Sequence, residues 1–392
     1  MKLLIVSRET YQDKAFGLGK AIGAIAEGLK QKGHSVTYIT IADWGENENT
    51  LFKRLIRIGG FISRFFGFAD YVIPPLAERF LQGMRAAKMV QNERYSHVWF
   101  QDPWIVMGFL YRQIFTINAH KIVWGVSEHG LGSFTQAVLL DGLALTEQWT
   151  KLLLRIEKYI LKKSAFVWGP STSTINLLTR DMGYARAPSH WRSIGYGKPV
   201  LNLMDKDAAR ALLGWDDATL YVIAIGRVAP VKRFDIVIQA CAVAQTKVEN
   251  LQLVIIGGEI DQNLIDLART SGLTHIPISI FTPSIDTYLA AADIYVSACE
   301  FESFGLANME AICAELPCVI AAGGGAIEVV SSGGWLCHPD PLSMGEAIKA
   351  IATDSTIKAF WKNAAKKRSS EFKEWREVVE EYETCLLSCS KN

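Results

Sequence analysis

Short apolar runs alternate with longer amphipathic stretches along most of the chain. In the first half, runs rich in β-branched and aromatic residues predict strands at 3–6, 36–40, 98–100, 122–126 and 166–168. In the second half, similar runs predict strands at 221–225, 251–256, 278–281, 294–297 and 319–321. Continuous apolar strands separated by helical stretches are typical of parallel sheets covered by helices on both faces. The pattern therefore predicts an α/β chain with two Rossmann-like domains in tandem.

The limits of these domains are marked by changes in the pattern. Residues 188–207 contain two prolines and two glycines without periodicity, which predicts a linker. We expect domains at 1–197 and 198–370, followed by a helix within 371–392. Ligands of open parallel sheets bind at the carboxyl ends of the strands, and two facing domains would form a cleft there.

Composition narrows the class of protein. The chain has 392 residues, 49% of them hydrophobic, which excludes a disordered chain. The chain contains no run of 18 uncharged apolar residues, so no transmembrane helix is predicted. The first apolar run is too short for a signal peptide, and we therefore expect a cytoplasmic protein. The seven cysteines show no metal-binding spacing, which favours reduced, buried thiols.

Charge is divided unevenly between the two halves. Residues 1–200 hold 25 Lys/Arg and 15 Asp/Glu, a balance of +10, whereas residues 201–392 hold 16 and 25, a balance of −9. The excess of positive charge in the first half is concentrated at 51–66, where large apolar residues are interleaved with Lys53, Arg54, Arg57 and Arg64. Two interpretations are open: a helix at an anionic membrane interface, or a core helix whose cations extend to water. Gly59-Gly60 argues against an uninterrupted helix.

Candidate ligand-binding loops follow several of the predicted strands. Gly17 and Gly19 lie before a predicted helix at 21–32, where glycine lets the backbone approach a phosphate, although the spacing is not that of a dinucleotide fingerprint. Arg227 and Lys232 follow the strand at 221–225, and two such cations suit a diphosphate. A plain glycine loop and a solvated basic loop are the alternatives.

The most specific pattern follows the strand at 294–297. There, Glu302 and Glu310 are eight residues apart and enclose Ser303-Phe304-Gly305-Leu306. Amides at the start of a helix suit a phosphate, and carboxylates accept hydrogen bonds from sugar hydroxyls. A glycine-rich turn at 323–325, followed by Glu328, comes after the next strand.

Together these motifs resemble glycosyltransferase family 4, which comprises retaining, nucleotide-sugar-dependent enzymes of GT-B fold. The resemblance is strong over 220–335 and weaker elsewhere. In the first half, Gly17 and Gly19 resemble the family's glycine loop, and Glu128-His129-Gly130 resembles its active-site histidine loop. Residues 371–392 resemble the closing helix that crosses back onto the N-terminal domain.

The resemblance implies a role for each matching residue. Arg227 and Lys232 would hold the donor diphosphate, and Glu310 would bind the ribose. Glu302 and His129 would contact the transferred sugar from the two domains. The first domain would bind the acceptor and the second the UDP- or GDP-sugar.

Other features depart from the family or bear on metal binding. Residues 193–198 differ from the turn that often enters the second domain of the family. Asp205-Lys206-Asp207 imitates the metal-binding D-x-D motif of other glycosyltransferases, but it precedes a helical pattern, so we interpret Asp207 as a helix N-cap. We expect neither a catalytic metal nor a cofactor beyond the donor substrate.

The sequence thus predicts a retaining hexosyltransferase that acts on a hydroxyl of a saccharide acceptor. The basic 51–66 segment favours a lipid-linked acceptor and peripheral contact with an anionic membrane, as in polysaccharide or glycolipid assembly. The alternatives are a GT-B nucleotide-sugar epimerase, a phosphorylase, and a non-catalytic sugar-nucleotide-binding partner. No nucleic-acid-reading motif accompanies the charge.

Overall fold

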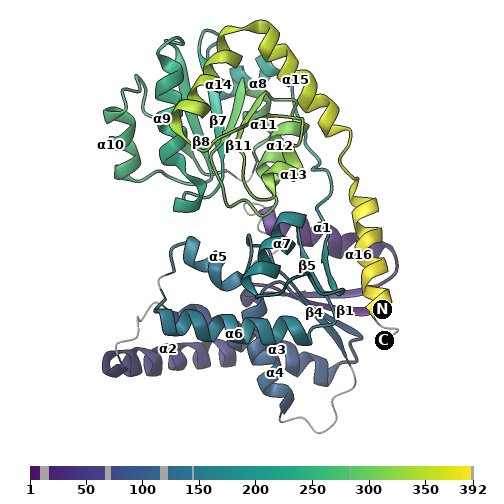
Figure 1. Cartoon of the computed structure of the whole chain (residues 1–392). Helices are drawn as coiled ribbons and strands as arrows, with labels where there is room; N and C mark the ends of the chain where they lie inside the picture. Colours follow the sequence, from purple (N-terminus) through teal and green to yellow (C-terminus); the bar gives the residue numbers. More distant parts are fainter. Residues whose placement is uncertain (9–16, 67–71, 115–121, 144, 283, 390–392) are drawn as a thin grey trace. The chain divides into compact units, whose positions relative to one another are not determined.

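The computed structural model describes residues 1–8, 17–66, 72–114, 122–143, 145–282 and 284–389, with the backbone alone at 62–66 and 114. The chain divides into two units, each built on a six-stranded sheet (Figure 1). The first unit combines Met1–Tyr196 with Trp375–Asn392, and the second is Gly197–Glu374. These limits lie within a few residues of the domain boundaries expected from the sequence.

The first sheet is parallel throughout and has the order β2-β1-β3-β4-β5-β6. Its strands are β1 (Lys2–Val6), β2 (Ser35–Ile39), β3 (His97–Phe100), β4 (Val123–Ser127), β5 (Val167–Gly169) and β6 (Trp191–Ser193). Residues 3–6 of strand β1 are apolar, and the strand lies between β2 and β3, which is the position that this uninterrupted pattern predicts.

Helices cover both faces of this sheet. On one face lie α1 (Gly17–Gln31) and α16 (Trp375–Cys389), and on the other α3 (Ile73–Asn92), α4 (Pro103–Ile114), α6 (Glu147–Lys163) and α7 (Thr172–Asp181). Helix α2 (Glu46–Phe66) packs against α3, and α5 (Phe134–Leu140) packs against α6. The C-terminal helix α16 thus completes the core of the first unit, in which Tyr382 contacts the rings of Trp99 and Trp168.

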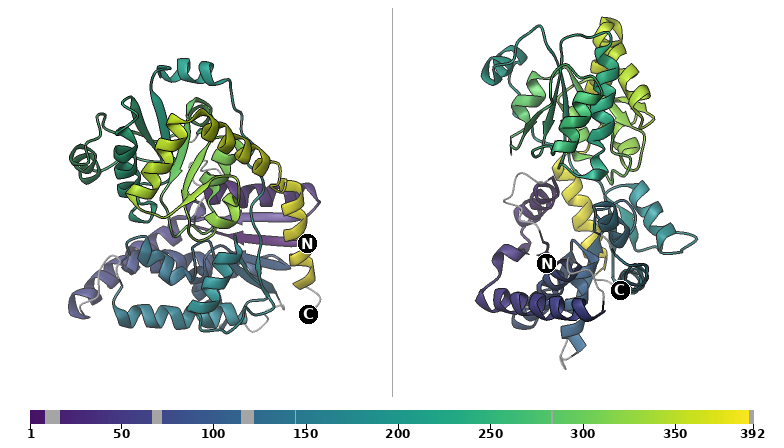
Figure 2. Two further views of the ribbon diagram at one scale, coloured as in Figure 1. Left: turned by 45° about the horizontal axis from the view of Figure 1, so that its top comes forward. Right: turned by 90° about the vertical axis from the view of Figure 1, so that its left-hand side faces the viewer.

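The second sheet is also parallel, with the order β12-β11-β10-β7-β8-β9. Its strands are β7 (Leu220–Ile225), β8 (Leu251–Ile256), β9 (Ile278–Ile280), β10 (Ile294–Ser297), β11 (Cys318–Ala321) and β12 (Trp335–Cys337). Figure 2 shows this sheet between two layers of helices. The order reverses between β7 and β10, so the ends of these two strands are the point at which such sheets bind ligands.

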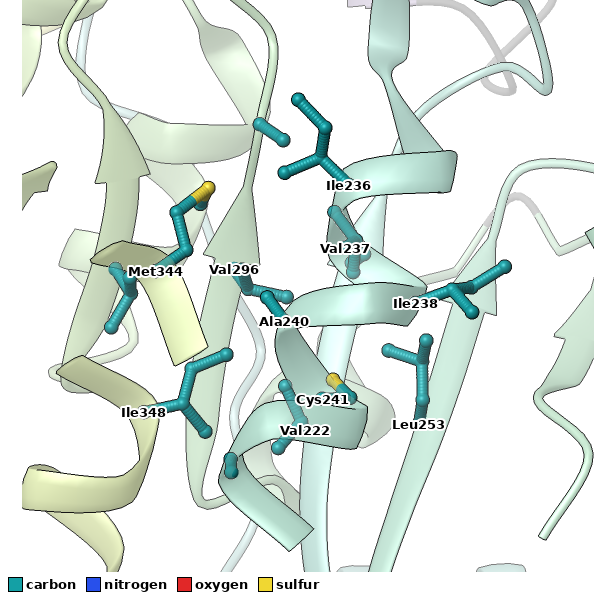
Figure 3. Packing of buried hydrophobic residues seen from close by; sticks show 14 of the residues in the cluster. Val222, Ile236, Val237, Ile238, Ala240, Cys241, Leu253, Val296, Met344 and Ile348 are labelled. Atoms are coloured by element: carbon teal, nitrogen blue, oxygen red, sulfur yellow. The ribbon is translucent and has the colours of Figure 1, made fainter. Parts of the chain in front are cut away.

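One helical layer of the second unit contains α9 (Phe234–Gln245), α10 (Gln262–Thr270) and α14 (Pro341–Thr353). The opposite layer contains α11 (Asp286–Ala291), α12 (Leu306–Cys313), α13 (Ala326–Val330) and α15 (Ser355–Ser369), and α8 (Lys206–Leu213) packs on α11. Figure 3 shows how Val237 and Cys241 of α9 face Val222 and Val296 of the sheet, with Met344 of α14 alongside. The sheet is therefore held on a dry core directly below the loops that follow its strands.

The fold corrects four predictions. Strands β6 and β12 were not predicted, and β6 lies inside the expected linker. Both are three-residue edge strands, too short for a periodic signal. Helix α2 continues through Gly59 and Gly60. Glycine at position 59 serves packing, since a Cβ there would lie 2.5 Å from the side chain of Ile73 at the start of α3.

The other two corrections concern helix starts. Gly17 and Gly19 belong to the first turn of α1 and are not in a loop before it. The N-cap of α8 is Asp205, whose carboxylate accepts from the backbone N–H groups of Asp207 and Ala208, so Asp207 is a first-turn residue.

Candidate functional site

The candidate site of the second unit begins where β7 ends. Strand β7 leads into Gly226, which has a φ of +157°, and a Cβ there would lie 3.3 Å from Cε of Lys232. A short 3₁₀ turn, Pro230–Lys232, then places Lys232 beside the end of the strand. Arg227 is exposed in the same loop, and the two cations repel each other. The sequence predicts both cations at this edge, and the structure places them there.

Glu302 lies in the loop after β10 and forms an ion pair with Lys232. The distance from Lys232 Nζ to Glu302 Oε2 is 2.7 Å, and their side chains are 26% and 16% exposed. Burial lowers the pKa of Lys232, but the negative charges of its surroundings, chiefly Glu302, and the hydrogen bond to Glu302 together outweigh burial, so the net shift is upward. Lys232 therefore remains a fixed positive charge at neutral pH.

The loop that carries Glu302 ends at Gly305, the N-cap of α12. Gly305 has a φ of +96° and no side chain caps the first turn of the helix. A Cβ at Gly305 would lie 2.7 Å from Nδ2 of Asn308, so a larger residue would meet both backbone strain and a steric clash. Within the loop, Phe304 is buried and Ser303 is partly buried, while Leu306 begins the helix.

Glu310 lies one turn further along α12. Burial raises the pKa of Tyr295, and the nearby carboxylates of Glu302 and Glu310 raise it further. The backbone carbonyl of Glu302 accepts a hydrogen bond of 2.6 Å from the N–H of Gly325, in the glycine-rich turn after β11. The structure thus brings the Arg227, Lys232, Glu302 and Glu310 motifs to one edge of one sheet.

Asn308 and Tyr295 are site residues that the sequence analysis missed. The Tyr295 hydroxyl donates a 2.8 Å hydrogen bond to Oδ1 of Asn308, whose side chain is buried. Among the described residues, Nδ2 of Asn308 has no hydrogen-bond partner. The only signal was a polar residue on the inward face of a helix, which is the kind of position where a buried amide supports a loop.

In the first unit, His129 follows β4 and is held on both sides. Its Nδ1 lies 2.9 Å from the Tyr196 hydroxyl, and its Nε2 lies 2.8 Å from Oε1 of Gln101, which follows β3. Burial lowers the pKa of His129 to about 3, so the imidazole is neutral at neutral pH. Gln101 and Tyr196 fix the orientation of the ring, and neither partner was predicted from the sequence.

Buried carboxyl groups lie behind this loop. Glu128 is fully buried, and among the described residues neither of its carboxyl oxygens has a hydrogen-bond partner. Burial, together with the charges of Glu157 and Asp102, raises the pKa of Glu128 well above its ordinary value. Asp102 forms an ion pair with the buried Arg79. The carboxyl group of Glu128 therefore lies in the protein interior, where burial favours its protonated form.

The cationic segment forms the outer side of α2. Lys53, Arg54 and Arg57 are exposed, together with Leu51, Ile58 and Phe61, which are 40%, 56% and 65% exposed. The side chain of Arg64 lies outside the described residues. No helix in the described part of the chain has the length and apolar content that a membrane crossing requires. Across the same residues, no group of three or more His, Cys, Asp or Glu is arranged to hold a metal ion.

Comparison with known proteins gives three relevant similarities. The family model "Glycosyl transferases group 1" matches residues 205–368. A D-inositol 3-phosphate glycosyltransferase of Rhodococcus opacus is 33% identical over 141 residues, which are 33% of this chain and 31% of that protein. An uncharacterized glycosyltransferase of Methanocaldococcus jannaschii is 26% identical over 188 residues, 46% of this chain and 48% of that protein. The chain thus spans less than half the length of these curated relatives.

Solved structures are similar over nearly the whole chain. Sucrose-phosphate synthase from Thermosynechococcus elongatus has a TM-score of 0.72 and 18% identity, with 99% of each chain covered. Anabaena HepE, solved in complex with UDP and glucose, has a TM-score of 0.70 and 16% identity, with 99% of this chain and 100% of that chain covered. At these identities the similarity shows the fold, which is GT-B. Residues 205–368 therefore match the group 1 glycosyl transferases, and the chain has the GT-B fold.

Proposed function

We propose that this protein transfers a hexose from a UDP- or GDP-sugar to a hydroxyl of a saccharide acceptor, with retention of anomeric configuration. The observation that carries the proposal is the grouping of Arg227, Lys232 and Glu302 at the β7–β10 edge, beside the uncapped start of α12. Cations and helix amides suit a diphosphate, and carboxylates suit sugar hydroxyls.

In this proposal, Lys232 and Arg227 stabilise the charge that grows on the departing diphosphate. Two fixed cations perform the neutralisation that a divalent ion performs elsewhere, so transfer proceeds without a metal. Glu310 binds the ribose, and Glu302 binds the hexose. His129 is neutral and acts through hydrogen bonding rather than as an acid, since its pKa is about 3.

The proposal is tested by calorimetric titration with UDP and GDP in the presence of EDTA, followed by transfer assays with the matching sugar conjugates. We expect one nucleotide to bind and the product to keep the anomeric configuration of the donor, as read by proton NMR. Binding of neither nucleotide would refute the proposal. Donor epimerisation without an acceptor would favour the epimerase alternative, and binding without turnover would favour a non-catalytic partner.

We further propose that the acceptor is lipid-linked and that α2 contacts an anionic membrane from the cytoplasmic side. The exposed side of α2 carries three cations and three large apolar residues, and the first half of the chain has a balance of +10. Apolar residues flanked by cations are the pattern of interfacial helices.

Sedimentation with vesicles of phosphatidylcholine and phosphatidylglycerol tests this contact. We expect Arg54→Glu with Arg57→Glu to release the protein from vesicles. The matched control is Lys362→Glu with Lys367→Glu, the same charge change at exposed positions of α15 in the second unit. Equal release by both pairs, or by neither, would rule out α2 as the contact.

A further inference from the structure

The ion pair between Lys232 and Glu302 joins two residues to which the proposed function gives different ligands. Lys232 is assigned to the diphosphate of the donor, and Glu302 to its hexose. In the structure, Nζ of Lys232 lies 2.7 Å from Oε2 of Glu302, and both side chains are largely buried. A carboxylate oxygen and a phosphate oxygen are equivalent partners for an ammonium group.

The carboxylate of Glu302 and the diphosphate of the donor are both negatively charged and repel each other. A diphosphate brought to Lys232 would place a second anion beside the carboxylate, where partial burial strengthens repulsion. Arg227 is near enough to repel Lys232 and adds positive charge for the incoming anion. The diphosphate therefore gains most if the carboxylate leaves Lys232.

The surroundings allow that exchange at little structural cost. The Lys232 stem lies over Gly226, and its backbone N–H is bonded to the Ala229 carbonyl at 2.9 Å. The backbone of Glu302 is tied by its carbonyl to the N–H of Gly325. The main chain is fixed at both residues, so rotation about the side-chain bonds of Glu302 is sufficient to break the pair.

We propose that the Glu302 carboxylate competes with the donor diphosphate for Lys232. When the diphosphate binds, it displaces the carboxylate, which then accepts hydrogen bonds from the hydroxyls of the hexose. This inference rests on the proposed function and deepens it, because it couples the diphosphate and hexose subsites. A nucleoside diphosphate alone must break the ion pair and provides a new partner only for Lys232. The complete nucleotide sugar provides new partners for both Lys232 and Glu302.

Calorimetric titration with UDP and with GDP tests the competition. We expect Glu302→Gln to bind the nucleoside diphosphate about tenfold more tightly than the unmodified protein, since a charged competitor has been replaced by a neutral one. Glu302→Ala should shift the affinity in the same direction, which guards against a folding defect in either variant. In a Lys232→Met background, Glu302→Gln should bring a much smaller gain, because only the direct repulsion between the carboxylate and the diphosphate is then removed.

Glu300→Gln is the matched control for a general change of charge. Glu300 lies two residues away in the same loop and pairs with Arg233 at 3.3 Å, not with Lys232. We expect its affinity for the nucleoside diphosphate to stay unchanged. The competition is overturned if the unmodified protein binds UDP or GDP but Glu302→Gln and Glu302→Ala bind no more tightly. It is also overturned if Glu300→Gln gives the same gain, or if the full gain persists without Lys232. A protein that binds neither nucleotide would overturn the proposed function and this inference together.

Discussion

Glu157 should make the first unit less stable as the pH rises. Its side chain is fully buried in α6, where it accepts hydrogen bonds from the backbone N–H groups of Phe134 and Thr135 and from the Thr135 hydroxyl, at 2.6–3.0 Å. These bonds favour the charged form, but burial outweighs them and raises the pKa from 4.5 to about 7. The folded protein therefore holds a proton that the unfolded chain releases.

The size of the effect follows from this difference. One pKa unit corresponds to about 1.4 kcal/mol, so a rise from 4.5 to about 7 corresponds to roughly 3 kcal/mol. Because the pKa is higher in the folded state, this stabilisation is fully present below pH 4.5. It is lost as the pH rises through 7.

Urea unfolding from pH 4 to pH 8 measures this loss through tryptophan fluorescence, since eight of the eleven tryptophans lie in the first unit. Glu157→Gln removes the titration, so its stability relative to the unmodified protein should rise by roughly 3 kcal/mol over this range. Any constant penalty from its altered hydrogen bonds cancels in the comparison. Glu147→Gln, on the same helix with a side chain 80% exposed, should give a flat difference. A flat difference for Glu157→Gln would refute the reasoning.

Three further predictions concern the second unit. Lys232→Ala should weaken binding of the nucleoside diphosphate by roughly 1.5–3 kcal/mol, and an unchanged dissociation constant in calorimetry would contradict its assignment. Gly305→Ala should lower stability by more than about 1 kcal/mol in urea unfolding, because φ is +96° and the new Cβ meets Asn308; a stable variant would argue against that backbone conformation. Tyr295→Phe should cost about 1–3 kcal/mol by leaving the Asn308 amide without its donor, whereas Tyr288→Phe, a partly buried neighbour, should cost less.

Strands in the middle of each sheet were predictable because they are apolar on both faces. Residues 3–6 and 251–256 have no polar position except Gln252, and the structure places them at β1 and β8. The edge strands β6 and β12 depend on a neighbour for their hydrogen bonds. Strand β6 contains polar residues, and β12, although apolar, has only three residues, too few for a clear signal. Their pairing is set by tertiary contacts that the local sequence does not encode.

The position of the motif residues at the edge of the sheet was predictable, because residues that are near one another in one loop stay near one another in the folded chain. Lys232 and Glu302 were both expected at the edge of the sheet, but their direct contact joins residues 70 positions apart. The partners of His129 show the same limit, since Gln101 and Tyr196 come from two other strand ends. Contacts between loops depend on strand order, which periodicity alone does not give.

The position of α16 has a consequence for synthesis. The first unit needs this helix to cover Trp99 and Trp168, yet residues 375–389 emerge from the ribosome after the entire second unit. Domains usually fold in the order in which they are made. Here the unit begun first is completed only after the second unit has been made. The nascent chain therefore carries an uncovered aromatic surface until translation reaches α16, and chaperones that bind such surfaces have most opportunity during that interval.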